Sequence, residues 1–407
     1  MTSPDPTAEA RRRTIHTAPA PYEFALIEET NSAKPWAVAA LFLAFLGLLL
    51  QSRALLAAAS MLGTSLLTAW IWAKLSFHGL QYERDFCDAD GQRGYGTEIR
   101  AFLGETVTLT LRVRNRKLLP LSWLRSIDIF PADLPVEGAN VIFNRGTHQG
   151  ELSAFWRPGA YETLERDFTI HCTERGYASF GPVTLSTGDG FGWFERRARL
   201  RGEHRLIIYP RLYTPEALGL PAKNPFGDRV SEQRLFEDPL RTAGVRDWHP
   251  GDRLSRVHWR ASAKQQHLLS RVYEPSEDPQ IQIVLNVATL ERHWEGVFTE
   301  KHEQAISVAA TLAYLANGMR MPVGLLANCY LPGSDQVIRL LPGRSQAQLM
   351  NILEALAAAT PYASQPLEDF VMRWAPGLPW GATIALVTVV TYPGLWEALR
   401  ELALAGR

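Results

Sequence analysis

The sequence predicts a multi-domain protein in which an N-terminal transmembrane helical hairpin precedes a β-sandwich of immunoglobulin-like type and a C-terminal α/β domain. Three observations support this fold class. Two apolar runs lie close together within residues 35–74, short alternating strands recur within residues 82–213, and strand and helix patterns alternate within residues 245–407. The chain of 407 residues is long enough for two soluble domains and a membrane element.

The first segment, residues 1–34, is polar and rich in Pro, Ala and Thr, which predicts a mostly disordered tail. After it, Trp36–Leu50 and Ala54–Ala73 form two apolar runs. The second run is long enough to cross a hydrocarbon core of roughly 30 Å, and the first is marginal. We therefore predict a two-helix transmembrane hairpin over residues 35–74.

Two other structures are compatible with the apolar runs. A cleaved signal peptide is disfavoured because the basic residues lie well before the first run, no small-residue cleavage site follows it, and a second apolar run does. A buried helical hairpin in a soluble domain stays open. The length of the second run, together with Trp36, Trp70 and Trp72 at the segment ends, favours a membrane.

Charge and cysteine usage indicate the compartment. Basic residues flank the ends of the hairpin that adjoin the tail and the soluble part, whereas the connecting turn holds only Arg53. The positive-inside rule therefore predicts that tail and soluble domains face the cytoplasm. The three cysteines, Cys87, Cys172 and Cys329, are odd in number and lack metal-ligand spacing, which favours free thiols in a reducing compartment.

Residues 82–213 contain alternating patterns such as Thr106–Arg114, which predict the antiparallel strands of a β-sandwich. Asp189, flanked by glycines, has no further carboxylates close by, so we expect a structural turn and not a calcium site. A basic cluster follows, interleaved with Glu195 and Glu203, and predicts a solvated edge strand. Its members are Arg196, Arg197, Arg199, Arg201 and Arg205.

Residues 214–244 hold several Pro and Gly residues and are expected to connect two domains. Beyond residue 245 the alternation of strands and helices predicts a mostly parallel sheet with helices on both faces. The expected strands are 281–287, 322–329 and 383–391, and the expected helices are 303–319, 345–359 and 395–405.

The segment Val245–Lys264 is the densest in charged and aromatic residues. From Arg241 to Arg271 there are seven basic and two acidic residues, in a chain whose 42 basic and 42 acidic residues cancel. A zero net charge argues against a general nucleic-acid binder. The local excess of basic residues predicts a cationic surface, or internal ion pairs of Arg256 and Arg260 with Asp247, Asp252 or Glu274.

Two local structures are compatible with this segment. Asp252 could cap a helix in which Leu254, Val257 and Ala261 pack on one face and a basic stripe lies on the other. The stripe would contain Arg253, Arg256, Arg260 and Lys264. A strand is the alternative, because Arg256, His258 and Arg260 alternate with Val257 and Trp259.

The run Gly251-Asp252-x-x-x-Arg-Val-His-Trp-Arg-Ala-Ser-Ala-Lys264, followed by Leu269-x-Arg-Val-Tyr-Glu274, resembles the signature of the bacterial "domain of unknown function 58" family. A weaker resemblance extends from the apolar hairpin near residue 36 to about residue 290. It implies a von Willebrand factor A-like domain at the C-terminus, a bacterial inner (cytoplasmic) membrane location and a partner among the MoxR-class AAA+ ATPases. The family has no established reaction.

Metal and catalytic chemistry is not expected. The first ligand position of a von Willebrand A-type magnesium site corresponds to Asn286, and the next two ligand positions are Ala288 and Leu290, so we predict no metal and no cofactor. Catalysis by His258 or Ser262 lacks a nucleophile-elbow or Ser-x-x-Lys motif. The chain also has no phosphate-binding Gly-x-x-x-x-Gly-Lys-Ser/Thr loop.

The favoured hypothesis is a non-enzymatic, membrane-anchored cytoplasmic interaction protein that works with a MoxR-class AAA+ ATPase in protein-complex assembly or cell-envelope maintenance. Asp252 would cap a helix and Trp259 would act as an anchor. The basic side chains would either bind the partner or form internal ion pairs. Alternatives are a hydrolase using the His258/Ser262 region and a binder of anionic lipid; the oligomeric state stays open. The predicted partner-binding or motif residues are Arg246, Asp252, Arg256, His258, Trp259, Arg260, Ser262, Lys264 and Arg271.

Overall fold

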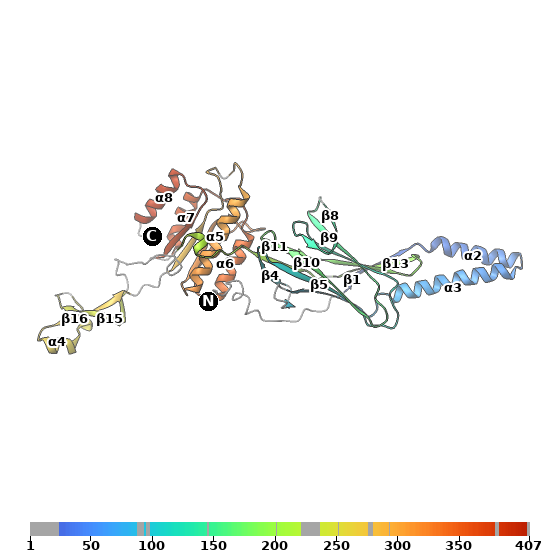
Figure 1. Ribbon diagram of the computed structural model, residues 1–407, viewed down its shortest axis with the longest axis horizontal. Coiled ribbons are helices and arrows are strands. Elements are labelled where there is room, and N and C mark those ends of the chain that lie inside the picture. Colours follow the sequence, from blue (N-terminus) through green and yellow to red (C-terminus); the bar gives the residue numbers. More distant parts are fainter. Residues whose placement is uncertain are drawn as a thin grey trace. The chain divides into compact units, whose positions relative to one another are not determined.

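The computed structural model describes residues 24–87, 93–94, 98–144, 146–200, 202–220, 237–250, 252–275, 280–292, 294–378 and 382–404. The chain divides into two compact units, residues 1–211 and residues 212–407 (Figure 1). Most of the predicted tail and residues 221–236 of the predicted connector lie outside the described residues.

The first unit begins with a strand where the sequence predicted disorder. Strand β1 (Phe24–Asn31) pairs antiparallel with β13 (Phe194–Leu200), so the prediction of a disordered tail is wrong for these residues. Pairing gives the backbone of β1 its hydrogen bonds, and an ion pair of 2.9 Å joins Glu29 to Arg196. Strand β13, which carries Arg196, Arg197 and Arg199, lies between β1 and β12 (Val183–Gly188). It is therefore not the predicted edge strand.

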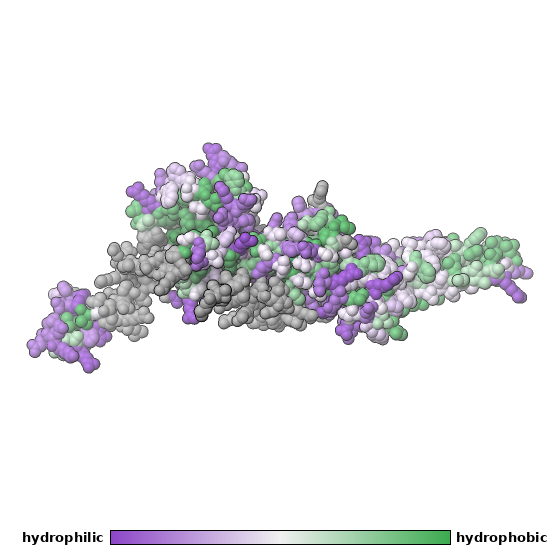
Figure 2. Space-filling model, in the orientation of Figure 1, coloured by the Kyte–Doolittle hydropathy of each residue, from purple (hydrophilic) through white to green (hydrophobic). Residues whose placement is uncertain are grey.

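Two antiparallel helices follow, α2 (Lys34–Leu49) and α3 (Arg53–Leu75). Helix α3 is long and apolar enough to cross a membrane, and α2 is a shorter apolar helix. Figure 2 shows hydrophobic side chains over the outer surface of both helices. The exposed apolar residues include Val38, Leu41, Phe42, Phe45, Leu48, Met61, Leu67 and Ile71. This surface has the composition expected for a lipid-facing hairpin.

Polar contacts join the helices to the sheets of the same unit. Lys117 Nζ donates hydrogen bonds to the carbonyl oxygens of Leu75 and Ser76 at the end of α3. Arg196 Nη1 donates to the Lys74 carbonyl oxygen at 2.8 Å. Both cations therefore neutralise the carbonyl end of the helix dipole. Burial lowers the pKa of Lys117 to about 8.

The sheets of the first unit are mainly antiparallel. The six-stranded sheet has the order β1-β13-β12-β6-β9-β8 and contains β6 (Leu124–Pro131), β9 (Gln149–Trp156) and β8 (Asn140–Asn144). A five-stranded sheet has the order β3-β2-β5-β10-β7, with β3 (Arg93–Gly94), β2 (Leu80–Cys87), β5 (Thr106–Asn115), β10 (Thr163–His171) and β7 (Val136–Glu137). A three-stranded sheet joins β11 (Gly176–Phe180), β14 (His204–Tyr209) and β4 (Glu98–Phe102).

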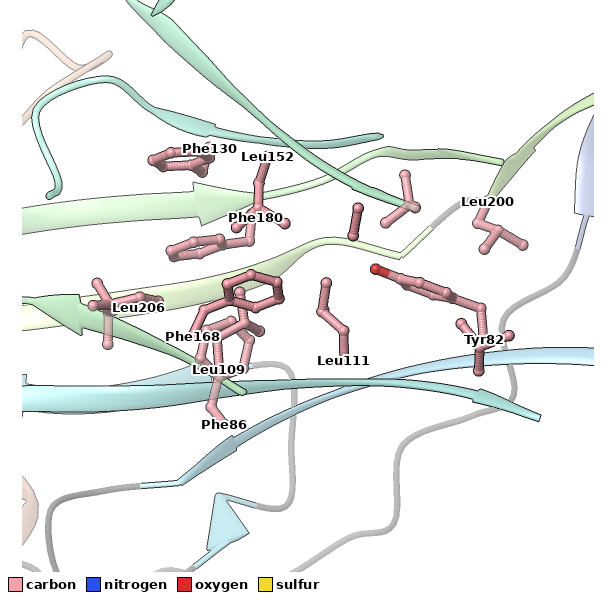
Figure 3. Close-up of a cluster of buried hydrophobic side chains, with 14 of the residues drawn as sticks. Tyr82, Phe86, Leu109, Leu111, Phe130, Leu152, Phe168, Phe180, Leu200 and Leu206 are labelled. Atoms are coloured by element: carbon pink, nitrogen blue, oxygen red, sulfur yellow. The ribbon is translucent and has the colours of Figure 1, made fainter. Parts of the chain in front are cut away.

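The hydrophobic core lies between these sheets, which confirms the predicted β-sandwich (Figure 3). Strand β5 alternates as predicted, with Val107, Leu109, Leu111 and Val113 buried. Phe180 packs edge-to-face on Phe86, with ring centroids 5.2 Å apart. The period of two places one side of each strand in the core and leaves the other for solvent.

One ion pair is enclosed in the sandwich. Arg84 of β2 and Asp128 of β6 are each 1% exposed, and Arg84 Nη1 lies 3.0 Å from Asp128 Oδ1. Arg84 Nη2 also donates to the Gly202 carbonyl oxygen. Burial raises the pKa of Asp128 above its ordinary value, although the positive charge of Arg84 opposes the rise.

Asp189 forms the structural turn that the sequence predicted. Its Oδ2 accepts a hydrogen bond from Phe191 N at 2.9 Å, and its Oδ1 accepts one from Phe194 N at 2.8 Å. The carboxylate is buried and fully used by the backbone of its own loop. The turn is therefore closed by Asp189 itself.

The second unit contains a four-stranded sheet of order β19-β18-β17-β20. Strand β17 (Ile281–Leu285) pairs parallel with β18 (Val323–Tyr330) and β20 (Thr383–Val387), and β19 (Val337–Gly343) pairs antiparallel with β18. Helices α5 (Thr299–Gly318) and α6 (Gln346–Ala358) contact β17 and β18, respectively. Helices α7 (Leu367–Trp374) and α8 (Pro393–Leu404) share a core with Val284 and Leu326.

The predicted α/β alternation is present, with two elements added. The antiparallel strand β19 and the short helix α7 were not predicted. Strand β19 ends in Leu340-Leu341-Pro342-Gly343, and a proline and glycine in a short run point to a loop in sequence analysis. Helix α7 has only eight residues, which is too few for a clear helical period.

Candidate functional site

The signature segment forms a small structure that we call the motif module, residues 237–275. Strands β15 (Glu237–Asp247) and β16 (Leu269–Pro275) pair antiparallel, and a 3-10 turn (Leu254–Arg256) and helix α4 (Trp259–Gln265) lie between them. The side chains of residues 237–243 and 272–275 lie outside the described part. The module therefore presents the signature residues on the connection of a β-hairpin.

Asp252 holds the turn after β15 closed. Its carboxylate accepts two hydrogen bonds from Arg246, at 2.8 and 2.7 Å, and a third from His249 N at 3.1 Å. The hydrogen bonds from Arg246, and then that from His249 N, lower the pKa of Asp252. The prediction that Asp252 caps a helix is wrong, because α4 begins at Trp259 with His258 as its N-cap, and the Asp252 carboxylate is bound by Arg246 and the His249 amide.

The helix starts later than predicted because Val257 belongs to a β-bridge. Val257 pairs with Ser270 of β16 and is buried. Helix α4 then begins after His258, whose Nδ1 accepts a hydrogen bond from Ala261 N at 3.2 Å and so caps the helix. The segment therefore combines parts of the helix and strand interpretations, and the predicted continuous stripe of basic side chains is broken.

Ser262 lies inside the module as a structural bridge. Its Oγ donates to the His258 carbonyl oxygen at 3.1 Å and accepts from Leu269 N at 2.9 Å. The side chain is 7% exposed. The hydroxyl thus joins the start of α4 to the start of β16, and its proton is directed to a carbonyl oxygen, away from any imidazole. This geometry does not support Ser262 as a nucleophile activated by His258.

Ser262→Ala is expected to destabilise the motif module by about 1–3 kcal/mol, because the buried Leu269 amide loses its acceptor. Hydrogen exchange measured by mass spectrometry should show faster exchange of the peptides that span residues 257–270. Ser255→Ala, at an exposed serine of the same module, is the control. Unchanged exchange in Ser262→Ala would show that the hydroxyl has no structural role.

The outer surface of the module exposes apolar and basic side chains together. Trp259 is 63% exposed and Leu254 is 66% exposed. Trp259 is therefore not part of the core, and the prediction that Leu254 packs on the apolar face is wrong; Val257 and Leu269 fill the interior instead. We call the following residues the exposed face: Arg253, Leu254, Trp259, Arg260 and Lys264.

The basic residues of the segment divide into two groups. Arg246 is held by Asp252, and Arg256 and Arg271 are half-buried. Within the part of the chain that the structure describes, no carboxylate lies within ion-pair distance of Arg253, Arg260 or Lys264. Arg246 therefore forms an internal ion pair with Asp252, and the predicted partner Glu274 has its side chain outside the described part.

The second candidate position is the end of β17. Asn286 Oδ1 accepts hydrogen bonds from Ala288 N and Asn328 Nδ2, and Asn286 Nδ2 donates to Thr388 Oγ1 at 3.1 Å. Asn328 Oδ1 accepts from Val287 N. Two asparagines thus tie together the ends of β17, β18 and β20. Among the described residues, no group of three or more His, Cys, Asp or Glu side chains could hold a metal ion.

Asn328 was missed in the sequence. A polar residue inside the otherwise apolar run Val323–Cys329 was the available signal, because a buried amide requires hydrogen-bond partners.

A second unpredicted feature is an open groove of about 580 Å³ on the six-stranded sheet. It is lined by Trp123, Arg125, Ile127, Phe155, Thr184, Ser186, Glu195 and Arg197.

Comparison with known families identifies the domain that carries the motif module. Residues 244–370 match the family described as "Protein of unknown function DUF58". This part of the chain is therefore similar to the members of this family, in agreement with the resemblance of its signature segment. The matched residues include the module from Gly244 onward and the α/β elements up to Phe370 in α7.

A curated relative is the "Uncharacterized protein YeaD" of Bacillus subtilis (strain 168), which is 23% identical over 219 residues. The match covers 53% of this chain and 50% of the relative, so the chain spans about half the length of that protein.

Two solved structures match about a third of the chain. The CARDB domain of a Pyrococcus furiosus protein, in complex with di-metal ions, has a TM-score of 0.18 at 9% identity and covers 32% of this chain and 90% of its own. A non-cellulosomal cohesin from Archaeoglobus fulgidus has a TM-score of 0.18 at 12% identity, and the match covers 34% of this chain and 96% of the cohesin.

Proposed function

We propose that this protein is a membrane-anchored cytoplasmic interaction protein whose motif module docks a partner protein with an acidic surface. The partner we propose is a MoxR-class AAA+ ATPase, acting in protein-complex assembly or cell-envelope maintenance. The observation that carries the proposal is the exposure of Trp259 and Leu254, which are next in sequence to the exposed basic residues Arg260 and Arg253, on the motif module.

The composition of the exposed face supports a protein partner. Exposed Trp and Arg side chains are enriched at the energetic centres of protein interfaces, and a cationic rim steers an acidic partner. Arg246 and Asp252 hold the preceding turn, and Ser262 holds the start of α4. The face is therefore pre-organised, which lowers the entropic cost of binding.

The hairpin supports membrane anchoring. The start of α2 and the end of α3 both adjoin the sandwich, since Ser32 N donates to the Trp193 carbonyl oxygen and Lys117 binds the end of α3. A hairpin that crosses twice leaves both ends on one side. The basic residues Lys34 and Lys74 at these ends favour the cytoplasmic side of a bacterial inner membrane. Cys87, Cys172 and Cys329 form no disulfide with one another, in keeping with a reducing compartment.

For the fold of the two domains we propose the finer classes that the sequence indicated, an immunoglobulin-like sandwich and a von Willebrand factor A-like α/β domain. The second is supported by the central position of β17 between two parallel neighbours. Asn286 lies directly after β17, where such domains often hold a magnesium ion. Here that position carries an amide network, which suits a binding domain that works without metal.

The test is affinity capture of the detergent-solubilised full chain from its host, with bound proteins identified by mass spectrometry. Wild type is expected to capture a MoxR-class ATPase, and Trp259→Ser/Arg260→Glu is expected to weaken binding about 30-fold or more, since a central Trp contributes 2 kcal/mol or more to an interface. Trp396→Ser/Arg400→Glu is a matched control, because Trp396 is 61% exposed on α8.

Circular dichroism and thermal unfolding establish that both variants fold. Loss of the ATPase in the first variant alone supports docking at the exposed face. Retention of the ATPase by a folded Trp259→Ser/Arg260→Glu variant, or its absence from the wild-type capture, would refute the proposal.

A further inference from the structure

An aromatic cluster lies where the helical hairpin meets the β-sandwich. Trp193 stacks on Phe191 with ring centroids 4.8 Å apart, and its ring centroid lies 6.1 Å from that of Trp36 in α2. Phe191 is 69% exposed and Trp36 is 49% exposed. We call Trp36, Phe191 and Trp193 the aromatic patch. It comes from two segments far apart in the sequence.

The loop that carries the patch is built to expose it. The buried Asp189 carboxylate binds Phe191 N and Phe194 N, and the Asp189 carbonyl oxygen accepts a hydrogen bond from Trp123 Nε1 at 3.2 Å. Gly192 has a φ of +78°, a conformation that other residues rarely adopt. The backbone therefore fixes Phe191 in an exposed position, although exposure of a Phe side chain to water is unfavourable.

The lengths of the helices place the patch at a defined depth. Helix α3 has 23 residues and α2 has 16, which at 1.5 Å per residue gives about 34 Å and about 24 Å. Both helices meet at the Leu50–Ser52 turn, so in a hydrocarbon core of roughly 30 Å α2 ends short of the far boundary. Trp36, in the first turn of α2, and the two rings next to it therefore lie toward one end of the membrane-spanning length and not at its middle.

We propose that the aromatic patch lies in the membrane interface and binds lipid between the headgroups and the acyl chains. The patch includes Trp36 of α2, a helix that also exposes Val38 and Leu41, so the loop rings lie beside an apolar helix that is expected to contact lipid. Trp side chains favour this interfacial region because they combine an apolar ring with a hydrogen-bond donor.

The consequence is that the sandwich contacts the bilayer surface through its β12–β13 loop, in addition to the covalent connection to the hairpin. The patch completes the apolar length that α2 lacks. This inference rests on the membrane anchor of the proposed function.

The test uses the full chain in phosphatidylcholine/phosphatidylglycerol vesicles, with single cysteines labelled by an environment-sensitive fluorophore. Cys87→Ser removes the partly exposed native thiol, and Cys172 and Cys329 are buried. Phe191→Cys reports on the patch. Leu67→Cys in α3 is the control inside the bilayer, and Phe143→Cys on the outer strand β8, also exposed, is the control outside it. Nitroxide-labelled lipids, with the nitroxide shallow or deep in the acyl chain, serve as quenchers.

The expected result is that Phe191→Cys is quenched more strongly by the shallow nitroxide, Leu67→Cys more strongly by the deep one, and Phe143→Cys by neither. Quenching at Leu67 without quenching at Phe191 would overturn the inference and leave the membrane anchor standing. Absence of quenching at both positions would overturn the membrane anchor itself, and the inference with it.

Discussion

Arg84→Met is expected to destabilise the β-sandwich by about 3–5 kcal/mol, because it leaves the Asp128 carboxylate buried without its charge partner. The pair is enclosed, with side-chain exposures of 0% for Arg84 and 2% for Asp128. Burial and the Arg84 charge lower the pKa of His204 to about 4 in the wild-type protein; burial, the larger cause, persists in the variant and disfavours a cation at His204. Thermal unfolding in mild detergent should show a Tm lower by roughly 6–20 °C.

The double variant Arg84→Met/Asp128→Leu is the control for this prediction. It removes both charges together, and apolar replacements of buried ion pairs are often neutral or stabilising. The double variant should therefore recover most of the lost Tm. A double variant as unstable as Arg84→Met would show that the hydrogen bond from Arg84 to the Gly202 carbonyl oxygen carries the stability.

The loss of thermal stability in Arg84→Met should also depend on pH. In this variant Asp128 loses the Arg84 charge that opposes the effect of burial, so its folded-state pKa lies further above its unfolded value of about 3.9 than in wild type. Such a group favours the folded state below the unfolded pKa, and this contribution is lost as pH rises through the folded pKa. The Tm difference from wild type should therefore shrink between pH 7 and pH 5. A difference that stays constant over this range contradicts a buried unpaired carboxylate.

The sequence indicates that Arg84 and Asp128 are buried charged residues, but it does not indicate that they pair with each other. Arg84 and Asp128 occupy inward positions of the alternating strands Leu80–Cys87 and Leu124–Pro131, which share a face with Tyr82 and Phe130. A charged residue at an inward position predicts a buried partner. The strands belong to different sheets, however, and a single sequence does not show which inward positions meet across the core.

The signature segment could be predicted in part. Its charge asymmetry left a cationic surface and internal ion pairs of Arg256 and Arg260 as alternatives, and the ion pair that the structure shows is that of Arg246 with Asp252. Which residues do so depends on long-range contacts: the bridge of Val257 to Ser270 keeps Val257 extended, and β15 brings Arg246 to Asp252. Local periodicity contains neither contact, so the helix and the strand had equal support. The same reason explains β1, which is a strand only because β13 pairs with it.

Asn286→Asp is expected to destabilise the α/β part of the second unit by on the order of 3 kcal/mol, because it places a carboxylate in a buried site that lacks a cation. Asn286 is 1% exposed. An aspartate can keep the hydrogen bonds from Ala288 N and Asn328 Nδ2. Its second oxygen, however, would face Thr388 Oγ1, which donates its proton to the Val390 carbonyl oxygen.

The effect of Mg²⁺ on the Tm of Asn286→Asp distinguishes a former metal site from an amide network that never bound a metal. If Asn286 occupies a site that a single carboxylate could restore, millimolar Mg²⁺ should raise the Tm of Asn286→Asp. We expect no rise. The side chains that bind Asn286 are those of Asn328 and Thr388, which are both neutral, and a hard cation requires more than one carboxylate here. Asn351→Asp, the same change at an exposed position of α6, should leave the Tm nearly unchanged. A Tm of Asn286→Asp that rises selectively with Mg²⁺ would contradict the metal-free interpretation and reopen the end of β17 as a cation site.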